Sequence, residues 1–161
     1  MLSVTRKILV SAPKEHVSEY LRDLSRLADY GQKVDSRTVA YTDPHSAVAE
    51  ISGRCLGLPW RGSFRMKYTN DGGYRSDMIK GPPLKSAACG FHLRPVTGGT
   101  VLTHDEQYHL PSVLRPFRGF LERWLVRTME VELAVIKEES ERLHRRRMVE
   151  EIDRDVLLEH A

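Results

Sequence analysis

The sequence has few of the residues from which small proteins build covalent or metal-bound frameworks. Its 161 residues include two cysteines, Cys55 and Cys89, which lack the close spacing of a metal site. No segment approaches the roughly 18 apolar residues of a membrane span. The start of the chain carries no convincing export signal. These absences predict a reduced, cytoplasmic protein that holds no metal and no other cofactor.

Charge of one sign is also scarce. Lys and Arg number 25 and Asp and Glu 22, which gives a formal net charge of +3. So small an excess does not by itself indicate nucleic-acid binding. Hydrophobic residues make up 40% of the chain, and a chain of this length buries roughly 68–70% of its unfolded surface. The composition therefore predicts one ordinary folded domain.

The hydrophobic pattern changes period twice along the chain. Residues 2–10 alternate between apolar and polar side chains and predict a strand, and two short helical patterns follow within residues 13–31. Alternation returns over residues 34–110, where Asn70-Asp71-Gly72-Gly73 gives the clearest hairpin signal. Regularly spaced turn residues in this part predict an antiparallel meander of five or six strands.

The last part of the chain has helical periodicity. A broad apolar stripe predicts one amphipathic helix from Ser112 to Leu143. It would be about 48 Å long, whereas a ten-residue strand covers about 33 Å. We therefore expect an α+β fold in residues 1–143, in which a curved antiparallel sheet of about seven strands wraps around the long C-terminal helix.

Residues 144–161 are predicted to form a charged helical extension or tail. A basic run, His144-Arg145-Arg146-Arg147, is followed at once by acidic residues. The simplest interpretation is a solvated helix end, and contact with an acidic partner, nucleic acid or lipid headgroups is the alternative. Met148, Ile152 and Val156 recur every four residues, which favours either a homodimer contact or a frayed end.

The last predicted strand carries the candidate catalytic residues. Alternation places His104, Glu106 and Tyr108 on the concave face, toward the helix. A carboxylate beside an imidazole raises the basicity of the ring, so His104 and Glu106 are candidate acid/base groups and Tyr108 a candidate donor. A purely structural role, in which His104 and Glu106 only make a cavity polar, stands beside this hypothesis. A register error of one residue would turn Thr103, Asp105 and Gln107 inward instead.

Apolar side chains of the sheet and of the helix are predicted to line one cavity between them. Core packing explains any one of these residues equally well, so the prediction concerns the set. The sheet would contribute Trp60, Phe64, Met66, Tyr68, Met78, Phe91, Leu93 and Leu102. The helix would contribute Phe117, Leu121, Trp124, Leu125, Thr128 and Met129.

Several short sequence segments, in this order along the chain, resemble conserved segments of a known superfamily. They are Ile8–Pro13 with the Val17–Leu24 helix after it, Phe91–Thr100 with its Gly-Gly-Thr turn, Tyr108–Pro111, and Met129–Lys137. The sequence resembles the START-like superfamily, also called helix-grip or SRPBCC proteins, over about residues 2–143. It is most similar to the polyketide cyclase/dehydrase and coenzyme-Q-binding branch. Asp29-Tyr30-Gly31 stands where that branch usually has a tryptophan.

The resemblance implies a cavity for apolar or aromatic small molecules but does not choose between functions. The leading hypothesis is a binder or carrier of a lipid, an isoprenoid quinone or a polyketide-like molecule. The first alternative is a polyketide cyclase or aromatase that uses His104 and Glu106. The second is a protein that binds a macromolecular partner through its C-terminal helix and basic tail. The sequence is compatible with both a non-catalytic binder and an enzyme.

Overall fold

The computed structural model describes residues 1–159, with side chains to Arg154, and its order of elements matches the expected fold. Among those residues no helix is both long and apolar enough to span a membrane. The elements are β1 (Leu2–Val10), α1 (Lys14–Arg22), the 3-10 turn η1 (Leu24–Arg26), α2 (Leu27–Tyr30), β2 (Ser36–Asp43), β3 (Ser46–Cys55), β4 (Leu58–Tyr68), β5 (Tyr74–Lys80), β6 (Ser86–Val96), β7 (Gly99–His109), the 3-10 turn η2 (Ser112–Phe117) and α3 (Arg118–Glu159).

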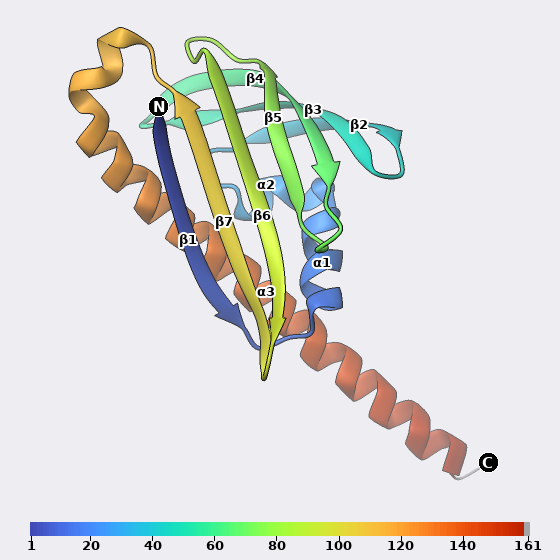
Figure 1. Cartoon of the computed structure of the whole chain (residues 1–161). Coiled ribbons are helices and arrows are strands. Elements are labelled where there is room, and N and C mark those ends of the chain that lie inside the picture. The colour runs from blue at the N-terminus through green and yellow to red at the C-terminus, as the bar shows by residue number, and fades with distance from the viewer. Residues whose placement is uncertain (160–161) are drawn as a thin grey trace.

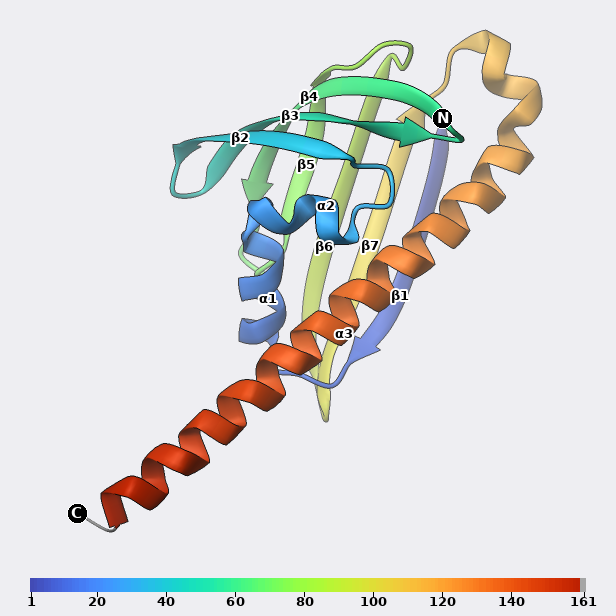
Figure 2. The same cartoon turned by 180° about the vertical axis from the view of Figure 1, so that it is seen from behind.

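All seven strands form one antiparallel sheet in the order β1-β7-β6-β5-β4-β3-β2. Figure 1 shows the sheet from its outer side with α3 passing behind it. Seen from the other side, in Figure 2, α1, α2 and α3 all lie against the inner face, and β2 to β4 curve over them. This is the helix-grip α+β fold that the sequence predicts.

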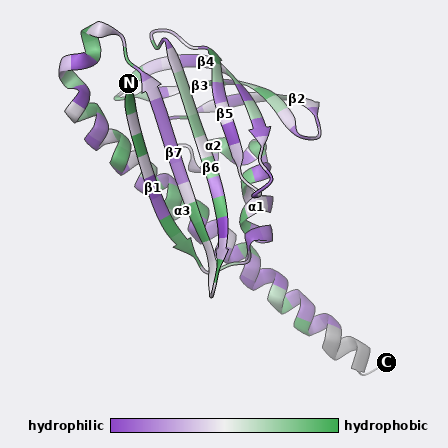
Figure 3. Cartoon of the chain, viewed as in Figure 1, coloured by the Kyte–Doolittle hydropathy of each residue, from purple (hydrophilic) through white to green (hydrophobic). Residues whose placement is uncertain are grey.

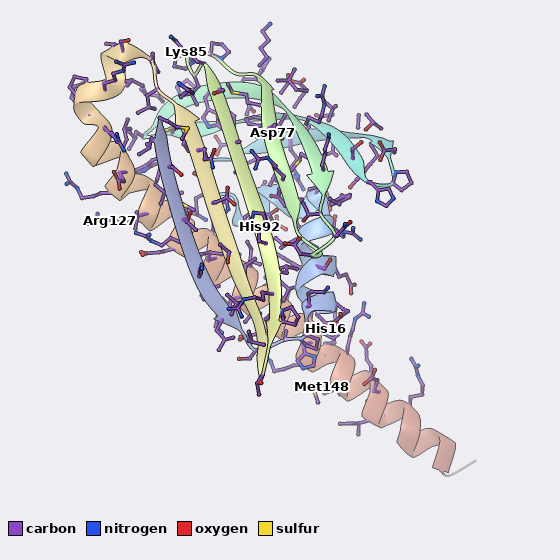
Figure 4. All side chains as sticks on the ribbon, in the orientation of Figure 1. His16, Asp77, Lys85, His92, Arg127 and Met148 are labelled. Carbon is purple, nitrogen blue, oxygen red and sulfur yellow. The ribbon has the colours of Figure 1, made fainter. Side chains whose placement is uncertain are left out.

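The register of β7 decides which side chains reach the helix. Val4 and Arg6 of β1 pair with Glu106 and His104 of β7. His104 and Glu106 are buried, whereas Asp105 between them lies on the outer face, where its Oδ1 is 2.9 Å from His92 Nε2. Figure 4 shows His92 and Asp77 on this outer face. The predicted register of β7 is therefore confirmed.

The hairpin predicted at residues 70–73 joins β4 and β5. The Asp71 carboxylate accepts hydrogen bonds from the Thr69 hydroxyl and from the Gly73 amide at 3.1 Å. Gly72 adopts φ +92°, a conformation that strongly favours glycine. Contacts between neighbouring residues therefore specify the turn, which explains why the sequence alone predicts it.

Helix α3 takes part in two hydrophobic clusters. Its middle, at Leu133 and Ile136, packs into the main core with α1, α2 and the sheet. Its earlier part, at Leu125 and Met129, packs on Leu2 of β1 in a second, smaller cluster. The helix thus lies mainly along the β1 edge of the sheet.

The prediction that this helix begins at Ser112 is wrong. Residues 112–117 form the 3-10 turn η2, which contains Pro116, and α3 begins at Arg118. A proline lacks the amide hydrogen needed inside an α-helix and disfavours the α conformation in the residue before it. Phe117 is consequently 58% exposed rather than packed against the sheet.

At its other end α3 continues past Leu143 without a break. The helix has 42 residues, and residues 144–159 extend it by about 24 Å. Figure 1 shows this part projecting beyond the sheet, and Figure 3 shows that hydrophilic residues predominate along it. The side chain of Val156 and residues 160–161 lie outside the described part of the chain. The division at Leu143 stays a prediction.

Candidate functional site

Four charged side chains meet beneath α3, and we call them the ion quartet. Two come from β7, His104 and Glu106, which are 1% and 3% exposed. Glu132 comes from α3 and is equally buried. Lys33 comes from the loop between α2 and β2, and its side chain is 14% exposed. The charges reach this place from three separate parts of the chain.

Cationic and anionic side chains alternate around the quartet. The Lys33 ammonium donates to Glu106 Oε1 and lies 3.4 Å from Glu132 Oε1. His104 Nε2 lies 3.2 Å from Glu106 Oε1 and 3.2 Å from Glu132 Oε2. Each carboxylate therefore contacts both cationic side chains.

The hydrogen-bond partners of His104 fix its protonation. Nδ1 lies 2.9 Å from the Gly90 carbonyl oxygen, which only accepts, so this nitrogen carries a hydrogen. Nε2 faces two carboxylates and carries one for the same reason. Burial alone lowers the pKa of His104, but the hydrogen bonds to Glu106 and Glu132 outweigh it and raise the pKa to about 9. At neutral pH the ring is an imidazolium, stacked on Phe91 with ring centroids 4.0 Å apart.

The same contacts keep Glu106 and Lys33 charged. Burial opposes ionisation of Glu106, but Lys33 and His104 hold its pKa well below the usual range. Burial also opposes the charge of Lys33, but Glu106 and Glu132 keep its pKa well above the usual range. Tyr108 donates to Glu106 Oε2 at 2.8 Å, and burial raises the pKa of its hydroxyl. Two cations thus balance two anions.

This arrangement limits the chemistry that His104 can perform. A general base needs an unprotonated nitrogen near the working pH, whereas both ring nitrogens here are donors to protein acceptors. The geometry therefore argues against His104 as a general base at neutral pH. It agrees with the structural alternative, in which His104 and Glu106 satisfy each other inside a polar patch.

The donor atoms of His104, Glu106 and Glu132 lie within 4.8 Å of one another, which is a spacing compatible with metal ligation. Lys33 contacts both carboxylates, so an ammonium already supplies the positive charge that a metal ion would bring. The expectation that the protein holds no metal stays a prediction.

The loop that carries Lys33, residues 31–35, is fixed to both walls of the fold. Trp60 Nε1 of β4 donates to the Lys33 carbonyl oxygen at 3.0 Å. The backbone N–H of Gln32 donates to Glu132 Oε1 of α3 at 3.1 Å. Gly53 of β3 permits this approach, because a Cβ there would lie 1.8 Å from the Lys33 carbonyl oxygen. The loop thus connects the sheet to the helix.

Replacing Gly53 with alanine should displace this loop and destabilise the protein. The clash is with backbone, which cannot move without breaking the Trp60 hydrogen bond, so we expect a loss of about 2 kcal/mol or more in unfolding free energy. Urea unfolding measures it. The control is Gly119→Ala on α3, where a Cβ meets nothing within 4 Å and should stabilise by about 0.5–1 kcal/mol. Equal stability of Gly53→Ala and the wild type would contradict the close approach.

Sequence reasoning found only part of the quartet. It places His104 and Glu106 on the inner face, but does not place Glu132 or Lys33 beside them. Glu132 had a signal, because it continues the buried helical spacing of Leu125, Met129 and Ile136. No local sequence pattern marks Lys33, because its partners Glu106 and Glu132 lie 73 and 99 positions further along the chain.

The predicted cavity-lining residues fall into three groups. Met66, Phe91, Leu93, Leu102, Leu125, Thr128 and Met129 are buried, and most of them belong to the two clusters. Trp60, Phe64, Tyr68, Met78, Leu121 and Trp124 are half-buried. Phe117 is exposed, as described above. The structure therefore brings the first group into the core and leaves the second partly accessible.

The described part of the chain includes two surface hollows of similar size. One, of about 490 Å³, lies beside Trp60 and Pro82 at the end of the sheet where the Lys33 loop meets β3 and β4. The other, of about 500 Å³, lies between α1 and the projecting part of α3 and is lined mostly by charged residues. Of these two, only the first includes a residue of the half-buried apolar group, Trp60, in its lining.

Comparison with protein families gives one match over most of the chain. Residues 1–141 match the model of the family described as polyketide cyclase / dehydrase and lipid transport. A comparison with the sequences of curated proteins found no match.

Solved structures with the same fold share little sequence with this chain. A protein of Thermus thermophilus is 18% identical, with a TM-score of 0.76, over 86% of this chain and 96% of that one. The Zhui aromatase/cyclase of Streptomyces sp. R1128 is 18% identical, with a TM-score of 0.73, over 87% and 93%. A START superfamily protein of Mycobacterium smegmatis is 16% identical, with a TM-score of 0.71, over 88% and 98%.

Proposed function

Since the chain belongs to the polyketide cyclase/dehydrase and lipid transport family, we propose that it binds a hydrophobic small molecule between its sheet and the first half of α3. The observation that carries this proposal is a set of half-buried apolar side chains on the sheet and on α3, the two walls of the proposed site. Trp60, Phe64 and Met78 come from the sheet, and Leu121 and Trp124 come from α3.

Helix α3 packs on the β1 edge of the sheet, away from β4. The first half of the helix rests on β1, where Leu125 and Met129 contact Leu2. Trp60 and Phe64 pack on each other edge to face on β4, with ring centroids 6.0 Å apart. β1 and β4 are separated in the sheet by three strands. Apolar surface left accessible on both walls gains free energy when a ligand covers it, at about 25 cal/mol per Å².

The ion quartet supports binding rather than catalysis. Its charges balance, and each of its charged side chains has protein partners. His104 has no free ring nitrogen to act as a base at neutral pH. The cyclase alternative, with His104, Glu106 and Tyr108 as acid/base groups, is therefore not the function that we favour.

The walls favour a flat ligand. Trp60, Phe64 and Trp124 present aromatic rings, which stack well on planar rings. Among the proteins of similar fold are an aromatase/cyclase and a di-domain ARO/CYC of the steffimycin biosynthetic pathway. We therefore propose an aromatic polyketide-like molecule as the ligand class, ahead of a lipid or an isoprenoid quinone.

Binding of three probes by isothermal titration calorimetry tests the proposal: a hydroxylated anthraquinone, a short-chain ubiquinone and palmitate. We expect a dissociation constant of about 1–10 μM for the anthraquinone and weaker binding of the others. Met78→Glu should weaken binding at least about tenfold, because it places a charge in the apolar band.

The matched control for this experiment is Ile79→Glu. Ile79 is the next residue on β5 and is exposed on the opposite face of the sheet. It should leave binding unchanged. The proposal fails if none of the three probes binds, or if both variants weaken binding equally.

A further inference from the structure

The part of α3 that projects beyond the sheet carries an apolar stripe that faces solvent. Met148, Val149 and Ile152 are 49%, 57% and 59% exposed. On an α-helix, these three positions fall within an arc of about 100°. Figure 4 shows Met148 just beyond the end of the sheet. Three large apolar residues on one exposed face are unusual for a solvated helix end.

The body of the protein does not use this face. The projecting helix is held from its other side, where Arg147 Nη2 lies 2.6 Å from Glu19 Oε1 and the His144 ring lies 5.1 Å from that of His16, both on α1. Ser140, one turn earlier, is fully buried on that side. By helical rotation the centre of the stripe lies about 130° from Ser140 and about 150° from Arg147, and Met148, one turn after His144, forms its edge nearest the body.

The charges around the stripe are self-complementary. Arg145 and Arg146 precede its centre, and Glu151 and Asp153 follow it, all with exposed side chains. If two copies lie antiparallel and cross near Val149, the basic half of each faces the acidic half of the other. A parallel pair would instead place like charges opposite each other, which is unfavourable.

We infer that the projecting segment, residues 144–154, is a homodimerisation surface on which two copies of the chain pair antiparallel about Val149. The contact is isologous, as expected for a two-fold dimer. Three apolar residues per copy give a small interface, so the dimer is of moderate affinity and depends on protein concentration. This inference does not depend on the proposed ligand.

Sedimentation velocity of the full chain measures the assembly. At about 100 μM we expect the wild type to sediment mainly at twice the 18.5 kDa mass of one chain. Ile152→Lys should sediment as a monomer. Val113→Lys, at another exposed apolar position in η2, is the matched control and should stay dimeric.

Charge exchange tests the antiparallel arrangement. An acidic variant, Arg145→Glu with Arg146→Glu, and a basic variant, Glu151→Lys with Asp153→Lys, should each be monomeric because both halves of the segment then repel their counterparts. An equimolar mixture of the two should regain the dimer. A monomeric wild type, a dimer that survives Ile152→Lys, or a mixture that stays monomeric would each overturn the inference.

Discussion

Replacing Lys33 with methionine should cost about 3–5 kcal/mol of unfolding free energy, because it leaves a buried cluster with one cation and two anions. Both carboxylates contact the Lys33 ammonium and have little access to water. Urea unfolding followed by circular dichroism measures the loss. If the variant no longer folds at 25 °C, its unfolding at 5 °C or in a stabilising osmolyte still ranks it against the wild type.

Two further variants separate charge balance from general damage. Lys33→Met combined with Glu132→Gln removes one charge of each sign and should recover part of the lost stability. Lys80→Met, at an exposed lysine of β5, should change stability by less than about 0.5 kcal/mol. A Lys33→Met variant as stable as Lys80→Met would show that the quartet carries no charge coupling.

The second large effect is a loss of stability in mild alkali. The pKa of His104 rises from its ordinary value of 6.5 to about 9 on folding. The stability that this provides is fully present below about pH 6.5 and is lost as the pH rises through about 9. Linkage gives a contribution on the order of 3 kcal/mol, since one pKa unit corresponds to about 1.4 kcal/mol.

Guanidinium unfolding at a series of pH values measures this dependence, and His104→Gln is the comparison because it removes the titrating ring. The variant should be less stable than the wild type at pH 6 and should have a flatter profile between pH 6.5 and 9. Parallel profiles would show that His104 is not protonated in the folded state. At acid pH the sign reverses, because the lowered pKa of Glu106 provides stability that is lost as the pH falls.

The sequence was sufficient for the fold because the relevant signals are local. Alternation along β7 placed His104 and Glu106 inside without knowledge of any neighbour. Asp71 and Gly72 specified the β4–β5 turn through contacts within a few residues. The start of α3 was missed, although Pro116 carried the information, because the apolar spacing before it continued the helical period.

The candidate site was less predictable because two of its four charges depend on tertiary contacts. Lys33 lies in a loop whose position is set by Trp60 on β4 and by the close approach of Gly53 on β3. Without Lys33, the pair of His104 and Glu106 resembles a catalytic dyad. With Lys33 and Glu132 it becomes a balanced ion cluster, and the interpretation changes from catalysis to structure.

A ligand held between the sheet and α3 should lie close to both tryptophans of the chain, since one stands on each wall. The indole N–H signals of Trp60 and Trp124 in a ¹H–¹⁵N NMR spectrum therefore report on both walls in a single titration with the hydroxylated anthraquinone. We predict that both signals shift with the same dissociation constant and that Met78→Glu weakens both together. If neither indole signal moves while the probe binds, or if only one wall responds, the ligand does not lie between the sheet and α3.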